Sequence, residues 1–176
     1  GAPALITAGH LPKDTPEDEL IDIRDRWRNA NPAIVQFWYT VEAAAREAVE
    51  HGRRVELNGG RLVFAYEMDV KNDFLTIQLP NGRKLYYAHP HMGVNRFGRP
   101  AVCYWGVNQK SHKWEVIETY GGRLTENITQ AAARDCLAEA IDRLEAAGYP
   151  VVFHIHDEVV IDAPPGRDSL EEEIGR

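Results

Sequence analysis

The chain has 176 residues, 44% of them hydrophobic, and a formal net charge of −7 at pH 7. This length fits one ordinary domain, and this apolar content is enough for a real core. The sequence contains no run of about 18 apolar residues, as a membrane span would need, and its N-terminus lacks the basic start and apolar stretch of a secretory signal. We therefore expect a cytoplasmic protein without a membrane partner.

The two cysteines, Cys103 and Cys136, lie 33 positions apart and form no metal or redox motif. With no sign of secretion, both are expected to be reduced, buried thiols.

Charge is distributed unevenly along the chain. Residues 1–50 carry a net charge of −4, residues 51–123 of +5 and residues 124–176 of −8. A basic middle between acidic flanks could form a local phosphate-binding face. A sheet with charged outer edges explains the same charges equally well.

Two helices are predicted near the N-terminus. Thr15-Pro16-Glu17-Asp18 supplies a hydroxyl cap, a proline in the first turn and acids at the positive end of the helix dipole. This helix should end near Asn29, and a second should start at Asn31-Pro32 and stop at Gly52. The aromatic stripe on these helices is expected to be core, and consists of Trp27, Phe37 and Trp38.

Strands are predicted from Arg53 to Thr119. The segments "RRVELNGGRLVFAYEM" and "FLTIQLPNGRKLYYAHP" each alternate around a glycine-containing turn, and "PAVCYWGVNQKSHKWEVIETY" adds one or two strands. Lys and Arg are interleaved with aromatic residues here, at Tyr86, Tyr87, Phe97, Trp105 and Trp114. Such interleaving is typical of single-strand or template binding, but also of any solvated antiparallel sheet.

A long helix follows Gly121-Gly122, in "LTENITQAAARDCLAEAIDRLEAAGYP", and Gly148 with Pro150 should end it. Its predicted apolar face comprises Leu124, Ile128, Ala132, Leu137, Ala140, Ile141 and Leu144. The final "PPGRDSLEEEIGR" could begin one more helix with a solvated acidic face.

The segment "PVVFHIHDEVVIDAP" predicts two buried strands, Val151–Ile155 and Val159–Ile161, around His156-Asp157-Glu158. Two carboxylates at a stiff hairpin tip repel each other unless a cation or a proton intervenes. Mg²⁺ is typically held by one or two carboxylates plus substrate phosphates. The spacing favours a magnesium site over a plain polar turn only modestly.

A zinc half-site is an alternative, because His154, His156 and Asp157 lie close together in the sequence. A zinc-dependent hydrolase would need another protein ligand. The His89-x-His91 pair could supply one.

Several segments together resemble the family A DNA polymerases, especially the phage and prophage forms. "HIHDEVV" is similar to the acidic hairpin of the palm, and "YGGRLTENITQAAARDCLAEAIDRL" to the helix before it. "DRWRNANPAIVQFWYTVEAAA" resembles the helices after the fingers helix, and "NRFGRP…YWGVNQKSHKWEVIETYGG" the phage-type insert. The likeness runs in order over nearly all of the chain.

The resemblance implies a role for each matching residue. Asp157 would be one of two catalytic carboxylates that bind Mg²⁺, with Glu158 assisting beside it and His156 approaching the primer 3′ end. Arg123 and Gln130 would contact template–primer DNA. Asn127 would join them, although the family helix has one more residue between the last two positions.

The resemblance also implies an incomplete active site. No Asp-Tyr-Ser-x-Ile-Glu strand occurs, and neither does a fingers helix with a Lys and a Tyr-Gly pair. We therefore expect the C-terminal part of a polymerase that would use primer–template DNA and dNTPs, but is inactive alone. Exposed apolar surface could make the fragment self-associate. A non-catalytic DNA-binding module of the same fold is the main alternative.

The expected fold class is α+β: a partial palm with an antiparallel hairpin backed by a long helix, N-terminal helices and a small β-rich insert. The expected division is a helical segment over residues 1–52, the insert over 53–120, and the palm helix with its catalytic hairpin over 121–176.

Overall fold

The computed structural model describes residues 2–95 and 97–163, so the predicted helix in residues 164–176 lies outside the described residues. The elements are, in chain order, α1 (Ala2–Thr7), α2 (Glu17–Ala30), α3 (Pro32–His51), β1 (Val55–Leu57), β2 (Leu62–Met68), β3 (Asp73–Gln78), β4 (Lys84–Val94), β5 (Pro100–Val107), β6 (Trp114–Glu118), α4 (Gly121–Ala146), β7 (Val151–Ile155) and β8 (Glu158–Ile161). The expected α+β class is confirmed.

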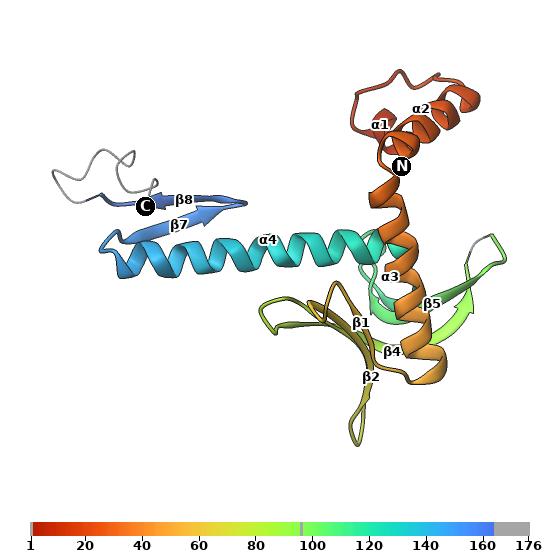
Figure 1. Ribbon diagram of the computed structural model, residues 1–176. Helices are drawn as coiled ribbons and strands as arrows, with labels where there is room; N and C mark the ends of the chain where they lie inside the picture. Colours follow the sequence, from red (N-terminus) through yellow and green to blue (C-terminus); the bar gives the residue numbers. More distant parts are fainter. Residues whose placement is uncertain (1, 96, 164–176) are drawn as a thin grey trace.

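Figure 1 shows how these elements are arranged. The six-stranded sheet lies against α3, and α1 and α2 lie at the opposite end of that helix. The helix α4 projects away from the sheet as a long arm, and the β7–β8 hairpin lies beside its outer half. None of the helices in the described part of the chain combines the length and the apolar character that a membrane span requires.

The helix α2 starts where predicted but is capped differently. Pro16 is its N-cap residue, and no side chain caps the helix. The Thr15 hydroxyl instead donates to the carbonyl of Pro12 at 2.7 Å, so the expected hydroxyl cap is wrong. The expected acids of the first turn, Glu17 and Asp18, are present.

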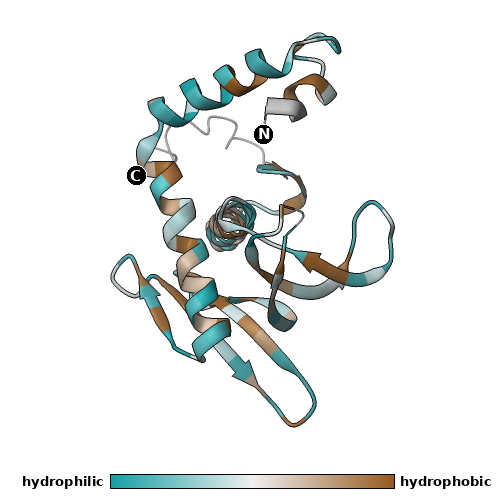
Figure 2. Cartoon of the chain, turned by 90° about the vertical axis from the view of Figure 1, so that its right-hand side faces the viewer, coloured by the Kyte–Doolittle hydropathy of each residue, from teal (hydrophilic) through white to brown (hydrophobic). Residues whose placement is uncertain are grey.

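The aromatic stripe on α2 and α3 is only partly core. Phe37 packs against the core, but Trp27 is 45% exposed and no residue of α2 is buried. Trp27 instead stacks on Trp38, with ring centroids 5.6 Å apart. Figure 2 shows α2 as mostly hydrophilic, which explains why this helix packs through few side chains.

The main core lies between α3, the sheet and the first turns of α4. Fully burying a side chain the size of Leu or Phe contributes about 1.5–3 kcal/mol, so this cluster is the main source of stability. Its buried members are Val41, Ala44, Ala45, Ala48, Leu62, Phe64, Leu75, Ile77, Leu79, Tyr87, Val102, Leu124 and Ile128.

The sheet is an antiparallel meander in the order β1-β2-β3-β4-β5-β6. Gly82 adopts a φ of 88° in the β3–β4 turn, as the Asn81-Gly82 signal predicts. The strand β4 contains an irregularity between Ala88 and His91, where His89 has a φ of 48°. A bulge lets Pro90 stand inside a strand, because proline has no N–H to donate to the ladder.

The helix α4 begins against α3. A Cβ atom on Gly121 would lie 1.9 Å from the backbone oxygen of Trp38, so only glycine fits this approach. The Gly121 N–H donates to the Glu42 carboxylate at 3.1 Å, which supplies the first turn of α4 with an acceptor.

Only the first turns of α4 are buried. Leu124 and Ile128 belong to the core, whereas the remaining residues of the predicted apolar face are half-buried, because the helix leaves the sheet. The predicted stop is confirmed, since Gly148 has a φ of 84° and its N–H donates to the Glu145 carbonyl.

Both cysteines are free thiols, as expected. Cys103 is buried, and burial raises the pKa of its thiol. Cys136 is exposed, which corrects the expectation that both are buried, because it lies on the part of α4 that projects from the sheet.

Candidate functional site

The acidic hairpin is a separate two-stranded sheet. Its strands pair Ile155 with Glu158 and His154 with Val159, so His156 and Asp157 form the turn. His156 adopts a φ of 53°, a left-handed conformation that lets two residues reverse the chain. The reversal predicted at His156-Asp157 is therefore confirmed.

The acids at this turn are open to solvent. Asp157 and Glu158 are both exposed, and neither side chain makes an ion pair or hydrogen bond to another described residue. Figure 1 shows the turn directed along α4 towards the sheet. The carboxylates are therefore available to a cation or a ligand approaching from that side.

The expectation that both strands are buried is wrong for this chain. Val152, Phe153 and Ile155 are 62%, 49% and 53% exposed. The hairpin lies beside the outer half of α4, where the Val151 N–H donates to the Glu145 carboxylate at 2.6 Å. The six-stranded sheet does not extend to the hairpin, where Val151, Val159 and Ile161 are half-buried and the other apolar residues are exposed.

The residues expected to contact DNA lie on one stripe of α4. Arg123, Asn127 and Gln130 are spaced four and then three residues apart, which places them on the same helix face. Gln130 is exposed and its amide lies 3.5 Å from the Glu126 carboxylate. The stripe starts beside the sheet and runs towards the hairpin.

Arg123 has two neighbours at the base of α4. Its guanidinium donates to the Glu118 carbonyl at 3.2 Å and lies 5.8 Å from the centre of the Tyr120 ring. These contacts orient the side chain while leaving it half-buried, with donors to spare.

Asn127 has a structural partner. Its amide donates to the Tyr87 hydroxyl at 3.0 Å, which ties α4 to β4. Burial raises the pKa of Tyr87 to about 12, although the hydrogen bond from Asn127 opposes this shift. This contact gives Asn127 a role in packing that the sequence did not indicate.

The two histidine pairs belong to different parts of the fold. His154 and His156 lie in the hairpin, whereas His89 and His91 lie on β4. His89 Nδ1 contacts the Asp73 carboxylate at 2.6 Å, and His91 Nδ1 contacts the His89 carbonyl at 3.0 Å. Across the described residues, no group of three or more His, Cys, Asp or Glu side chains is placed to hold a metal ion.

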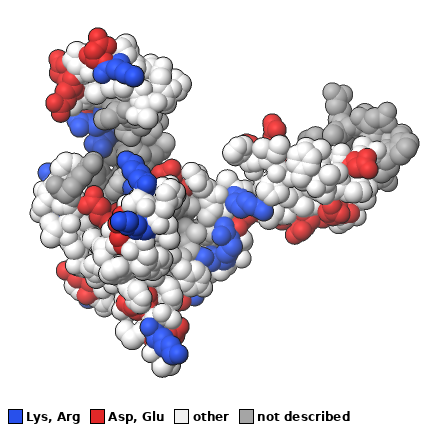
Figure 3. All heavy atoms as spheres, turned by 180° about the vertical axis from the view of Figure 1, so that it is seen from behind, with Lys and Arg blue, Asp and Glu red and all other residues white. Residues whose placement is uncertain are grey.

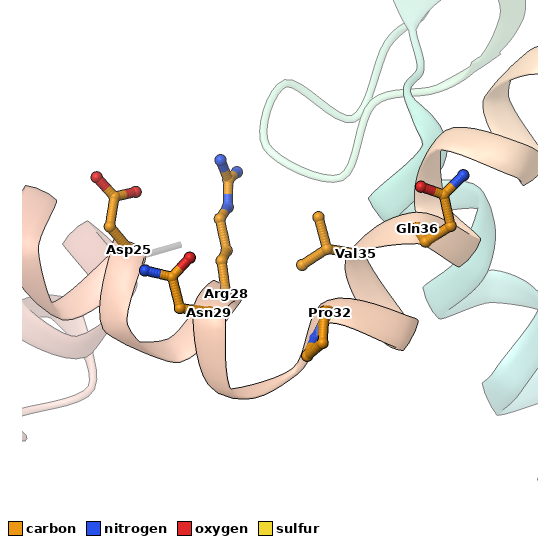
Figure 4. A pocket seen from close by; sticks show the side chains of 6 residues that line it. All are labelled: Asp25, Arg28, Asn29, Pro32, Val35 and Gln36. Carbon is orange, nitrogen blue, oxygen red and sulfur yellow. The ribbon is translucent and has the colours of Figure 1, made fainter.

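Two hollows were not predicted from the sequence. A shallow one of about 540 Å³ lies at the junction of α2 and α3, where Arg28 stands beside Asp25 and Asn29 (Figure 4). A second, of about 520 Å³, lies beside the Trp27–Trp38 stack and reaches Tyr120 at the base of α4. No signal in the sequence indicated the second hollow, since Trp27 and Trp38 were expected to lie in the core.

The chain is similar to a known protein. The chain is 48% identical over 172 residues to the DNA polymerase of Bacillus phage SP02. The aligned part covers 97% of this chain but only 26% of the phage protein, so the chain spans about a quarter of the length of that relative. No family model matches the chain, and no solved structure matches it.

Proposed function

We propose that this chain is part of a family A DNA polymerase, and that its β7–β8 hairpin carries one half of the catalytic metal site. The observation that supports this most is the 48% identity to a phage DNA polymerase along almost the whole chain. The exposed, unpartnered pair Asp157–Glu158 at a tight turn agrees with it.

The half-site follows from the ligands present. Carboxylate oxygens suit Mg²⁺, which needs six ligands and accepts water and phosphate among them. The described residues bring no third ligating side chain to Asp157 and Glu158. We infer that the other carboxylate comes from a part of the polymerase outside this chain, and that the chain alone does not extend a primer.

Each residue has a distinct task in the proposed reaction. Asp157, with Glu158 beside it, would hold Mg²⁺, which when bound activates the primer 3′-hydroxyl and neutralises charge on the leaving pyrophosphate. His156, at the same turn, would approach the primer end. Arg123 and Gln130 would bind the template–primer backbone and fix its register, which requires no sequence recognition.

The proposal is tested by Asp157→Ala in the full-length protein that contains this chain. We expect primer extension to fall by about 10²-fold to 10³-fold, the scale on which loss of a charge-stabilising catalytic group acts. Affinity for primer–template should change little, because it comes mainly from Lys and Arg contacts to phosphate. Single-nucleotide extension and fluorescence anisotropy measure the two quantities separately.

Asp162→Ala is the matched control. Asp162 is also exposed and lies just beyond β8. The control substitution therefore removes one negative charge next to the hairpin without changing the turn. It should extend primers like the wild type. Near-normal extension by Asp157→Ala, or equal losses in both variants, would refute the assignment of the site.

A second candidate is a DNA-binding module of the same fold without catalysis. The incomplete ligand set favours it for the chain as it stands. Both candidates predict that the 176-residue chain does not extend a primer, so templated extension by it would contradict both. If salt-dependent DNA binding persists and Asp157→Ala leaves the full-length enzyme active, the module is the correct function.

A further inference from the structure

A second feature of the molecule is a set of aromatic and aliphatic side chains on one face of β4, β5 and β6. The register pairs Trp105 with Val116 and Val107 with Trp114, which places these four side chains on the same face. We call the face formed by Tyr86, Trp105, Val107, Trp114 and Val116 the outer face. Tyr86 belongs to it because Ala88, two residues along β4, pairs with Trp105.

The outer face is exposed, whereas the opposite face forms the core. Exposed fractions are 60% for Tyr86, 38% for Trp105, 58% for Val107, 57% for Trp114 and 46% for Val116. By contrast, Tyr87 on the other face is 4% exposed. Contiguous apolar patches on a protein surface mark sites where something binds.

The outer face continues to the base of α4. Every second residue of this segment lies in one row, which consists of Trp114, Val116, Glu118 and Tyr120. Thr119, between the last two, is buried on the opposite side. Tyr120 keeps an extended backbone, at φ −154° and ψ 166°. At about 3.3 Å per residue, this row spans roughly 20 Å. It ends at Tyr120, which is 56% exposed and lies beneath the Arg123 guanidinium.

The charges near the outer face favour an anionic partner. Residues 51–123 carry a net charge of +5, although the whole chain is acidic. Lys110 and Lys113 are exposed in the turn next to Trp114, and no ion pair engages them in the described part of the chain. On the surface seen in Figure 3, basic side chains lie near the base of the α4 arm and acidic ones farther out.

Other charged side chains near the outer face either form ion pairs or hydrogen bonds already, or are acidic. Lys84 pairs with Glu67 at 2.6 Å, and Arg83 pairs with Asp135 at 2.7 Å. Glu115 accepts hydrogen bonds from Asn108 and Ser111. Glu118 is the acid in the Trp114–Tyr120 row and is half-buried, beside Arg123, which bonds its carbonyl.

We propose that the outer face binds single-stranded nucleic acid by stacking bases on Tyr86, Trp105 and Trp114, with Lys110, Lys113 and Arg123 meeting the phosphates. Rows of exposed aromatics bordered by cations bind single strands with little sequence preference, because every base has a π-face. A duplex keeps its bases stacked on each other, so it should gain nothing from these rings. The inference deepens the proposed function, since it assigns the chain a contact with an unpaired strand, remote from the hairpin turn.

The test uses the 176-residue chain and a fluorescein-labelled oligothymidylate of about 16 nucleotides, within the length that single-strand binding folds cover. Anisotropy gives the affinity without Mg²⁺ or dNTPs, so the result does not depend on catalysis. Trp114→Ala should weaken binding by about 5-fold to 150-fold, the effect of losing one stacked base. Trp105→Ala should act in the same direction.

Two further variants serve as controls. Trp114→Phe keeps a ring and should retain most of the affinity, which separates stacking from any loss of folding. Tyr39→Ala removes an aromatic side chain that is 58% exposed on α3, away from the outer face, and should bind like the wild type. Binding to a duplex of the same length should be insensitive to Trp114→Ala.

The results of these binding measurements can overturn the proposal. No measurable affinity of the chain for oligothymidylate, or unchanged affinity of both alanine variants, would overturn the proposal. If the alanine variants keep their affinity but lose self-association in sedimentation, the outer face contacts a second copy of the chain instead. Loss of primer extension in Asp157→Ala without any effect of the tryptophan variants overturns the outer-face proposal alone, whereas effects of the tryptophan variants with near-normal extension by Asp157→Ala overturn the proposed function alone.

Discussion

A single glycine sets the distance between the two longest helices. Gly121 lies where α4 leaves α3, and the oxygen that a Cβ atom would meet belongs to the backbone of Trp38. A backbone oxygen cannot rotate away as a side chain can, so the helices would have to move apart. Because α4 carries both the Arg123 stripe and the hairpin, this one contact positions the whole arm.

Gly121→Ala should therefore destabilise the chain by about 1–3 kcal/mol, the usual cost of overpacking that forces backbone shifts. Gly122→Ala is the matched control. Its Cβ would meet the Tyr120 ring, which is exposed and can turn aside, and alanine favours helix over glycine. Urea unfolding of both variants measures the difference, and equal stabilities would contradict the close-approach explanation.

Asn127 and Gln130 lie on the same stripe of α4 but have different roles. Asn127 donates to Tyr87, so Asn127→Ala leaves a buried hydroxyl without its partner, which costs about 1–3 kcal/mol. Gln130 is exposed, and Gln130→Ala should leave stability unchanged. In the full-length protein, Gln130→Ala should weaken primer–template binding more than stability. If Asn127→Ala leaves the unfolding midpoint unchanged, the tie to β4 contributes little.

At the scale of elements, Asp73 joins three strands of the sheet. Its carboxylate accepts the Tyr66 hydroxyl at 2.8 Å from β2 and contacts His89 at 2.6 Å on β4. Desolvation opposes its ionisation, but the hydrogen bonds from His89 and Tyr66 outweigh this, so the pKa of Asp73 lies below its usual range. The ionised carboxylate thus stabilises the folded sheet.

The sign of the pH dependence follows from this depressed pKa. The stability from Asp73 is fully present above the unfolded pKa of about 3.9 and is lost as pH falls through the lower folded value. Asp73→Asn should therefore be less stable than the wild type near neutrality, and the difference should shrink below about pH 4. Tyr66→Phe should show a smaller effect of the same form. A difference that stays constant from neutral to acid pH would refute the role of this carboxylate.

The sequence predicted the helices and strands better than it predicted which of their faces are buried. Helical periodicity and the stops at Gly52 and Gly148 gave α3 and α4, and the Asn81-Gly82 turn gave the β3–β4 hairpin. Periodicity cannot say which partner covers an apolar face, so Phe153 was expected to be buried and is exposed. The two faces of β4 illustrate the same limit. The adjacent residues Tyr86 and Tyr87 are the same amino acid, and only the pairing of the strands determines which of them is buried.

The candidate site was predictable for a different reason. Carboxylates and an imidazole at the tip of a hairpin are chemically unusual, so His156, Asp157 and Glu158 stand out without any knowledge of packing. The Tyr87–Asn127 bond and the Trp27–Trp38 stack join residues from separate elements. No local pattern contains such contacts, since they depend on how the helices and the sheet meet.

At the scale of the whole molecule, the compact sheet and the projecting arm differ in how well they are covered. The sheet half contains the main core, whereas the hairpin beside the outer half of α4 exposes large apolar side chains. An isolated two-stranded hairpin is marginally stable in water, so the arm needs a further layer to hold its shape. The chain covers only a quarter of its phage relative, which leaves ample chain for such a layer in the proposed parent protein.

We therefore expect the isolated chain to self-associate through the hairpin. Sedimentation velocity should show species heavier than the 19.9 kDa monomer, in proportions that rise with protein concentration. Phe153→Asp places a charge at the centre of the exposed strand and should return the chain to a monomer, because burying an unpaired carboxylate is costly. Val70→Asp puts the same charge on a fully exposed residue beyond β2 and should have no effect. A wild-type chain that stays monomeric at all concentrations would mean that the hairpin needs no covering layer, and would weaken the case that another part of a polymerase packs there.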